Sequence, residues 1–320
     1  MTKRAIRVAR MFDGERLVDG GVLVLLDDGR IVDVQRGRDE APEGWPVREE
    51  PNGTVLPGLV DAHVHLCADA GPDALGRLAE RPETDLDAVV ETSLRAHLAA
   101  GVTTVRDLGD RRGAVLRWRA REVRDDLPTV VASGAPVTTI GGHCWSMGGE
   151  VSGVDGIELC TCVTAAGAHV PDEVADRLAA SGVAVCATLG TDPAVVTPPE
   201  VVAMAARAGL SAATLRDGAA TLHRAGVRLV AGSDAGLGPA KPHGILPETL
   251  VEYVACGIPA TAALVAATSV GAEVCGLGRR KGRVRPGFEA DLLVVDGDPT
   301  SDISALRRPL AVYRAGDPVR

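Results

Sequence analysis

The order of apolar and polar positions divides the chain into two outer segments of short strands and a central segment in which strands and helices alternate. Residues 5–37 contain short apolar runs separated by the turn signals FDGE, DGG and DDGR, a pattern typical of antiparallel hairpins. The same pattern returns in residues 282–299 and 310–320. We therefore predict that the two ends of the chain pair into one small β-module.

The central segment alternates between apolar runs of strand length and amphipathic runs of helix length. The expected strands are residues 58–66, 102–108, 127–137, 154–163, 182–190 and 227–236. The expected helices are residues 84–101, 170–182, 197–209, 211–226 and 247–257. Alternation of this kind predicts a mainly parallel sheet, which at this chain length usually closes into a barrel, although only about six strands are found where a complete barrel has eight.

Two of the expected helices carry end signals. Thr84 or Asp85 is a candidate N-cap for the first helix. The helix at 170–182 has Pro171 near its start and Gly182 past its end, which is the usual asymmetry of helix termini.

The stretch VLPGLVDAHVHL, residues 55–66, places His63 and His65 two residues apart at the end of an apolar run. Because side chains alternate along a strand, both imidazoles project from the same face. Two neighbouring neutral imidazoles suit a divalent metal, for which histidine is the commonest ligand. The sequence therefore predicts a metal site at this strand end.

Composition narrows the class of protein. The 320 residues are 46% hydrophobic and 24% charged, as in an ordinary globular enzyme, and the net charge of −9 argues against nucleic acid as a partner. There is no signal-peptide pattern and no apolar run near the ~20 residues that span a membrane. The seven cysteines are scattered. We expect a cytoplasmic protein that acts on a small molecule and binds neither nucleic acid nor membranes.

Six segments together resemble the metal-dependent amidohydrolase superfamily, and in particular its imidazolonepropionase-like and bacterial Xaa-Pro dipeptidase-like branch. They occur in the order of the family and are accompanied by the β-module from both chain ends. The segments are LPGLVDAHVHL, GVTTVRDLG, GGHCWSMGGE, VRLVAGSDAG, ALVAATSVGAEVCGLG and GRVRPGFEADLLVVDGDP.

The resemblance implies a (β/α) barrel with its active site at the C-terminal ends of the strands. His63 and His65 match the metal ligands of the first strand. Asp234 matches the aspartate of the last strand, which binds metal and acts as the general base toward the attacking water. A divalent metal is therefore implied, with zinc as the expected ion and Mn²⁺ or another divalent ion as the alternative.

The sequence departs from the family between Gly149 and Asp155, where the fourth and fifth barrel strands are missing. The family's bridging lysine and its fifth-strand histidine disappear with those strands. The sixth-strand histidine falls at Leu159, which cannot bind metal. The remaining set of two histidines and one carboxylate is sufficient for one ion.

These observations predict an α/β fold: a TIM-type barrel that lacks two β/α units, plus a small β-sandwich built from both chain ends. The predicted sandwich domain comprises residues 1–56 and 283–320, and the predicted barrel domain comprises 57–282. A barrel that has lost two units has strand edges to cover, so we expect a homo-oligomer.

The leading functional hypothesis is a metal-dependent hydrolase that cleaves an amide-type carbon–nitrogen bond of a small molecule, such as a cyclic amide or a dipeptide. Asp234 is the predicted catalytic residue, and His143 and His243 are candidate substrate-binding residues because each lies in a loop at the predicted mouth of the barrel. His97 and His223 lie in helix patterns and are expected to be packed or solvent-facing. The alternative hypothesis is a catalytically impaired homologue that serves as a binding or scaffold protein.

Overall fold

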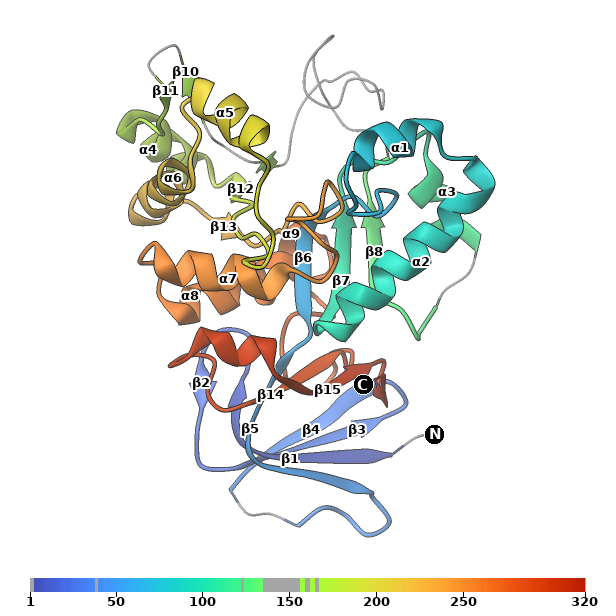
Figure 1. Cartoon of the computed structure of the whole chain (residues 1–320). Coiled ribbons are helices and arrows are strands. Elements are labelled where there is room, and N and C mark those ends of the chain that lie inside the picture. Colours follow the sequence, from blue (N-terminus) through green and yellow to red (C-terminus); the bar gives the residue numbers. More distant parts are fainter. Residues whose placement is uncertain are drawn as a thin grey trace.

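The computed structural model describes residues 3–37, 40–121, 124–134, 156–158, 162–164 and 167–319. A β-sheet forms one end of the molecule, and parallel strands flanked by helices form the other (Figure 1). Within the described ranges, no helix has the length and apolar character needed to cross a membrane.

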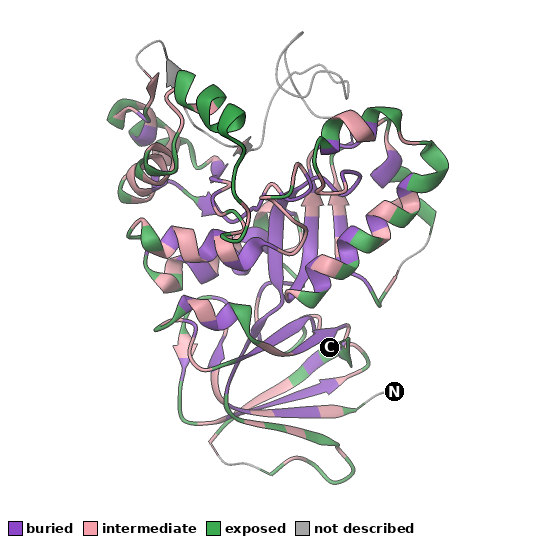
Figure 2. Cartoon of the chain, viewed as in Figure 1, coloured by how far each residue is buried: buried purple, intermediate pink, exposed green. Residues whose placement is uncertain are grey.

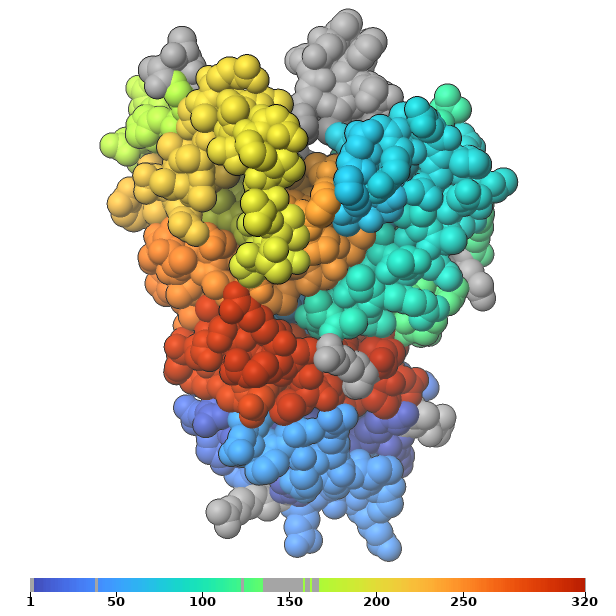
Figure 3. Space-filling model, viewed as in Figure 1, coloured from blue at the N-terminus to red at the C-terminus, as the bar shows by residue number. Residues whose placement is uncertain are grey.

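The β-sheet at one end of the molecule contains strands from both ends of the chain. Its eight strands are β1 (Arg4–Phe12), β2 (Leu17–Val18), β3 (Val22–Asp27), β4 (Arg30–Arg36), β5 (Val47–Pro57), β14 (Leu292–Asp296), β15 (Pro309–Arg314) and β16 (Asp317–Pro318). Strand β5 pairs in parallel with β1 on one side and antiparallel with β14 on the other. As a result, the N-terminal and C-terminal segments lie against each other in the space-filling view (Figure 3).

A tight turn joins β3 to β4, as the DDGR signal predicts. Asp27 pairs with Arg30, so only two residues form the loop. Both have positive φ, 48° at Asp28 and 76° at Gly29, which is the backbone of a type I′ hairpin turn. The turn matches the right-handed twist of the strands that it connects.

The second unit is built on two parallel three-stranded sheets. One contains β6 (Leu59–Val64), β7 (Val102–Asp107) and β8 (Thr129–Ala132), and the other contains β9 (Gly156–Glu158), β12 (Ala184–Cys186) and β13 (Leu229–Val230). Backbone hydrogen bonds join β6 to the chain at and after β13: Ala62 N–H donates to the Ala231 carbonyl (3.0 Å) and Asp234 N–H to the His63 carbonyl (2.8 Å). The six strands thus follow the order β9-β12-β13-β6-β7-β8, and in the described residues no ladder pairs β8 with β9.

Three expected strands differ from the structure in length. The strands expected at 182–190 and 227–236 are represented by the shorter β12 and β13, although the chain after β13 keeps backbone hydrogen bonds to β6 through Ala231, Asp234 and Ala235. The strand expected at 154–163 is divided into β9 and β10 (Val163–Thr164), and β10 forms a hairpin with β11 (Gly167–Ala168). Cys162 has a φ of 45°, a left-handed conformation that cannot continue a strand.

Helices alternate with the parallel strands along the chain, as expected of a β/α fold. They are α1 (Ala74–Glu80), α2 (Glu83–Ala99), α3 (Ala114–Arg121), α4 (Asp172–Ser181), α5 (Pro199–Arg207), α6 (Ala212–Arg224), α7 (Leu246–Ala255), α8 (Ala260–Ala266) and α9 (Ser269–Val274), and a 3₁₀ helix spans Ile303–Arg307.

The ends of two helices test the capping signals. Helix α4 begins after Pro171 and ends at Gly182, whose φ of 70° gives the left-handed C-terminal conformation that glycine favours, as predicted. The prediction for α2 was wrong: the helix begins at Glu83, and its N-cap is Pro82 rather than Thr84 or Asp85. Pro82 is already extended, with φ −57° and ψ 140°, so the helix begins at the first residue after it.

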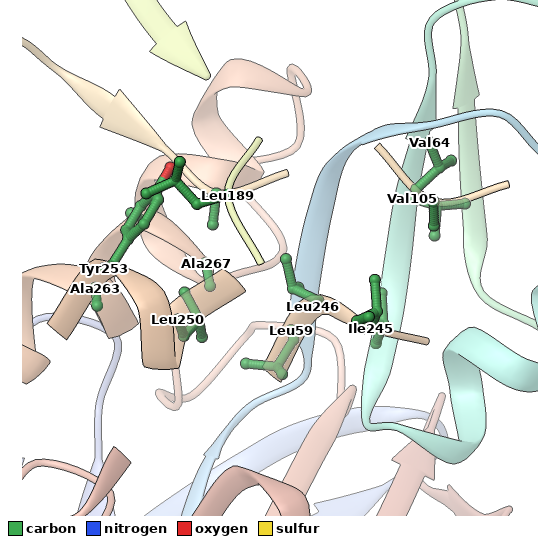
Figure 4. Close-up of a cluster of buried hydrophobic side chains, with 14 of the residues drawn as sticks. Leu59, Val64, Val105, Leu189, Ile245, Leu246, Leu250, Tyr253, Ala263 and Ala267 are labelled. Carbon is green, nitrogen blue, oxygen red and sulfur yellow. The ribbon is translucent and has the colours of Figure 1, made fainter. Parts of the chain in front are cut away.

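The core of the second unit lies between the parallel strands and helices α2, α7 and α8. Strands β6 and β7 are almost entirely buried (Figure 2). Leu246 of α7 lies beside Leu59 of β6, and Leu250 and Tyr253 of the same helix belong to the same apolar cluster (Figure 4). The Tyr253 hydroxyl also lies 2.9 Å from the Ala187 carbonyl and 3.1 Å from that of Val230. Helix α7 therefore fixes the point where β12 and β13 end.

A buried ionic cluster joins the two units. The Asp291 carboxylate contacts the Lys281 ammonium and accepts a hydrogen bond from the Arg314 guanidinium (2.8 Å). Arg314, on β15, also donates to the Leu127 carbonyl (2.9 Å) and the Thr129 hydroxyl (2.9 Å) at the start of β8. The side chains of Lys281, Asp291 and Arg314 are 2%, 4% and 6% exposed.

Candidate metal centre and active site

His63 and His65 lie at the C-terminal end of β6 and point to the same place, as their spacing predicts. The two Nε2 atoms are 3.3 Å apart, and each residue is 6% exposed. The His63 backbone N–H lies 3.4 Å from Asp61 Oδ1, and the His65 N–H donates to the Ala235 carbonyl (2.9 Å). The backbone of the two histidines is thus bonded to its own strand at His63 and to the segment after β13 at His65.

Asp234 reaches the same point from the segment after β13. Its Oδ1 lies 3.2 Å from the Nε2 of His63 and 3.2 Å from that of His65. The residue has a φ of 60°, a left-handed conformation that costs a non-glycine residue about 1–2 kcal/mol. Strain of this kind persists where the surroundings fix it, and it is frequent at functional sites.

The neighbouring Ser233 holds the backbone of this turn in place through hydrogen bonds to Asp61. The Ser233 N–H donates to Asp61 Oδ1 (2.9 Å), and its hydroxyl donates to Asp61 Oδ2 (2.5 Å). Burial raises the pKa of Asp61 to about 6, although the bonds from Ser233 act in the opposite direction. Asp61 therefore anchors the strained turn and lies outside the triad of metal-compatible atoms.

The other nitrogen of each histidine ring faces an acceptor. His65 Nδ1 lies 3.2 Å from the Gly109 carbonyl, and His63 Nδ1 lies 2.9 Å from Glu158 Oε2. A carbonyl and a carboxylate only accept hydrogen bonds, so a neutral ring whose proton lies on Nδ1 turns the lone pair of Nε2 toward Asp234. In that tautomer three acceptor atoms lie within 3.3 Å of one another, and a cation between them would stabilise the arrangement.

The spacing of these atoms fits a bound metal. Ligands about 2.0–2.1 Å from a tetrahedral zinc ion lie about 3.3–3.4 Å apart, which is close to the three distances in this cluster. His63, His65 and Asp234 form one of two groups in the described residues whose atoms could hold an ion, and the other is His63, Glu158 and Cys186.

The charges of the site are mutually dependent. Burial disfavours the charged form of His63, but hydrogen bonds to Asp234, Cys186 and Glu158 raise its pKa well above the ordinary value. Burial likewise acts to raise the pKa of Asp234, yet the bonds from His63 and His65 lower it below its usual range. The carboxylate is therefore ionised at neutral pH, and the site favours cations.

Glu158, Arg106 and Cys186 were missed from the sequence. Glu158 is the last residue of β9 and directly precedes Leu159, the residue expected at the position of the family's sixth-strand histidine. Cys186 is the last residue of β12. The alternation of side chains along each strand could have placed Glu158 on the inner face, but only the fold brings it to His63. Leu159 and His143 lie outside the described residues, so the predicted role of His143 stays a prediction.

His243 is half-buried and pairs with the buried His97. His97 Nε2 lies 3.2 Å from His243 Nδ1, and His243 Nε2 donates to the Ala68 carbonyl (2.8 Å). Both ring nitrogens of His243 therefore have partners inside the protein, and its predicted substrate contact stays a prediction. His97, expected to be packed or solvent-facing, is completely buried. Its Nδ1 has no hydrogen-bond partner among the described residues, and Asp61 Oδ2 lies 3.8 Å away.

We expect His97→Gln to make folding stability less sensitive to acid. Burial lowers the pKa of His97 well below its ordinary value, and His243 adds to this effect. The wild type therefore loses stability as the pH falls below about 6.5, because only the unfolded chain then protonates His97. The difference in unfolding free energy between wild type and variant, measured by urea denaturation, should shrink by up to about 2 kcal/mol from pH 7 to pH 5.

The matched control for this prediction is His223→Gln on α6. Its stability difference from the wild type should stay constant over the same pH range. A constant difference for His97→Gln as well would contradict a neutral, buried His97.

The comparison with known proteins bears on both fold and family. Residues 54–141 and 146–319 match the amidohydrolase family. A dihydroorotase from Citrifermentans bemidjiense is 38% identical over 61 residues, which are 19% of this chain and only 14% of the length of that curated relative.

Two solved structures share the fold over nearly their whole length. A prolidase in complex with N-methylphosphonate-L-proline has a TM-score of 0.77 at 23% identity, with 99% of each chain covered. A Xaa-Pro dipeptidase with bound methionine has a TM-score of 0.71 at 20% identity, again with 99% of each chain covered. The resemblance to the amidohydrolase superfamily drawn from the six sequence segments is confirmed by the family match, and the solved structures agree with its fold. This chain belongs to the amidohydrolase family.

Proposed function

We propose that this chain is a metal-dependent hydrolase that cleaves the amide-type carbon–nitrogen bond of a small molecule. The observation that carries the proposal is the convergence of His63 Nε2, His65 Nε2 and Asp234 Oδ1 at distances of 3.2–3.3 Å, with both Nδ1 atoms turned to other acceptors. Cyclic amides and dipeptides are the proposed substrate class, since dihydroorotase and prolidase are among the proteins that the chain resembles.

The three residues of the site would have different roles in catalysis. His63 and His65 would hold a divalent ion through Nε2, and Asp234 would hold it through a carboxylate oxygen. Such an ion lowers the pKa of a bound water from about 15.7 to about 7 and polarises the scissile carbonyl. Asp234, ionised at neutral pH, accepts a proton from the attacking water and delivers it to the leaving nitrogen. Its fixed backbone keeps the carboxylate in reach for both transfers.

We propose zinc as the ion, in a single site. Two imidazoles and one carboxylate form the ligand set of many catalytic zinc sites, which keep a further position open for water. Mn²⁺ or another divalent ion is the alternative. A single ion is proposed because, by the family resemblance, the lysine falls in the missing units and Leu159 takes the position of the sixth-strand histidine.

We further propose that the barrel lacks two β/α units and that a second copy of the chain covers the resulting edges. The six parallel strands of the described residues, with no ladder between β8 and β9, support this proposal. Residues 1–56 with 283–320, and residues 57–282, are the proposed domains. A cytoplasmic location is proposed because the described cysteines Cys67, Cys162, Cys186, Cys256 and Cys275 are free thiols.

The metal content of the purified protein tests this function. After chelator treatment and zinc loading, we expect about one tightly held zinc per chain by mass spectrometry, and none in the double variant His63→Ala/His65→Ala. The matched control is His169→Ala/His223→Ala, which removes two histidines away from the site. A wild type that holds no more zinc than His63→Ala/His65→Ala would contradict the hydrolase and favour the alternative, an impaired homologue that acts by binding.

A further inference from the structure

We propose that Glu158 is a positioning residue, held in place by Arg106, which keeps the proton of His63 on Nδ1 and so leaves Nε2 free to bind the metal. This inference deepens the proposed function and rests on it, because it assigns the residue that makes the first histidine a competent ligand. Neither Glu158 nor Arg106 belongs to the ligand set implied by the family resemblance.

Three neighbouring side chains carry the inference. Glu158 Oε2 lies 2.9 Å from His63 Nδ1, and Glu158 Oε1 accepts a hydrogen bond of 2.5 Å from Arg106 Nη2. Arg106 Nε in turn donates to the Ala62 carbonyl (2.8 Å), one residue before His63. The three residues come from β9, β7 and β6, so the chain of contacts crosses from one parallel sheet to the other.

The position of the His63 proton is contested by two carboxylates. Asp234 Oδ1 lies 3.2 Å from Nε2, and Glu158 Oε2 lies 2.9 Å from Nδ1. A proton on Nε2 would be donated to Asp234 and would occupy the lone pair that an ion needs. Glu158 is the nearer acceptor, and it keeps the proton on the far side of the ring. Carboxylates that act on metal ligands in this way typically contribute 10–100-fold to metal affinity.

Arg106 fixes the orientation of Glu158. The side chains of Glu158 and Arg106 are 27% and 14% exposed, and the guanidinium binds one oxygen of the carboxylate. The guanidinium is planar and anchored at the Ala62 carbonyl, which fixes the direction of Oε1 and therefore of Oε2. Among the described residues, the acceptor at His65 Nδ1 is the neutral Gly109 carbonyl at 3.2 Å, whereas His63 Nδ1 faces the carboxyl group of Glu158.

Glu158→Gln is a sharp test because it preserves the shape of the side chain. Arg106 can only donate, so it will bind the amide oxygen and turn the amide NH₂ toward His63 Nδ1. That nitrogen must then accept, and the proton moves to Nε2. The variant is therefore expected to invert the tautomer rather than merely loosen the ring.

The matched control is Glu252→Gln. Glu252 on α7 has a 26% exposed side chain and pairs with Arg216 at 2.5 Å, so it matches Glu158 in its own exposure and in the distance to its arginine. It lies outside both groups of metal-compatible residues.

The first readout is the tautomer of His63 in the metal-free protein. Nitrogen NMR of ¹⁵N-histidine-labelled protein at alkaline pH, with His63 assigned by the loss of its signals in His63→Ala, should show the proton on Nδ1 in the wild type and in Glu252→Gln. In Glu158→Gln it should lie on Nε2. The second readout is zinc affinity by competition with a chromophoric chelator, which should fall about 10–100-fold in Glu158→Gln alone.

The outcomes separate this inference from the proposed function. A wild-type His63 that carries its proton on Nε2, or a Glu158→Gln variant that keeps the wild-type tautomer or zinc affinity, would overturn the role of Glu158. An inverted tautomer in Glu158→Gln together with a wild type that binds zinc no better than His63→Ala/His65→Ala would support the effect of Glu158 on the ring and contradict the metal-dependent hydrolase.

Discussion

Asp234→Asn is expected to lower kcat/KM for amide hydrolysis by about 10²–10⁴-fold, the range attributed to a positioned general acid–base group. Asparagine has the size of aspartate and tolerates the left-handed backbone found at residue 234, so the fold of the turn should survive. Its amide cannot accept the proton of the attacking water, and it removes the negative charge toward which both histidines turn. The measurement is hydrolysis of a panel of cyclic amides and dipeptides by zinc-loaded protein.

The zinc content of each sample, measured alongside the rates, separates loss of the base from loss of the ion. Asp302→Asn, at the exposed start of the 3₁₀ helix, is the matched control and should have wild-type rates. If zinc-loaded Asp234→Asn hydrolyses its best substrate within about tenfold of the wild type, Asp234 is not the catalytic base.

Asp291→Asn is expected to lower the free energy of unfolding by about 3–5 kcal/mol, the usual cost of removing one partner from a buried ion pair. The change leaves Lys281 and Arg314 in a nearly solvent-free environment without their shared anion. Glu289, which lies 2.6 Å from the Lys281 ammonium, can compensate one of the two cations but does not reach the other in the structure. Urea denaturation of wild type and variant gives the difference.

The pH dependence of this contribution has a definite sign. Burial alone would raise the pKa of Asp291, but Lys281 and Arg314 hold it below its ordinary value. The stabilisation is therefore complete above the unfolded-state pKa of about 3.9 and is lost as the pH falls through the lower, folded-state value. Glu248→Gln, which breaks the partly exposed pair with Arg307, is the control and should cost at most about 1 kcal/mol. Equal losses for the two variants would contradict the special role of the buried cluster.

Local sequence patterns were sufficient where neighbouring residues decide the structure. The two-residue turn at Asp28 and Gly29 follows from backbone preferences of those residues alone. The shared direction of His63 and His65 follows from the alternation of a strand. Gly182 at the end of α4 needs no partner outside its helix.

Contacts between distant segments could not be read in this way. Glu158 acquires its role from Arg106 and His63, which lie 52 and 95 positions away in the chain. His97 looks like an ordinary position on an amphipathic helix, and only the fold brings His243 against it. The start of α2 was misplaced because two good capping residues follow a proline that already has the extended backbone required before a helix.

The pairing of β5 with β14 has a consequence for synthesis on the ribosome. Strand β5 is translated before the parallel strands of the second unit, β6 to β13, whereas its partner β14 is translated after them. Until then the nascent chain presents one side of β5, ending in the apolar residues Val55 and Leu56, as an unpaired edge. Strand β14 therefore closes a sheet that β1 and β5 began, and the growing chain has to keep the β5 edge from other strands while residues 58–291 are translated.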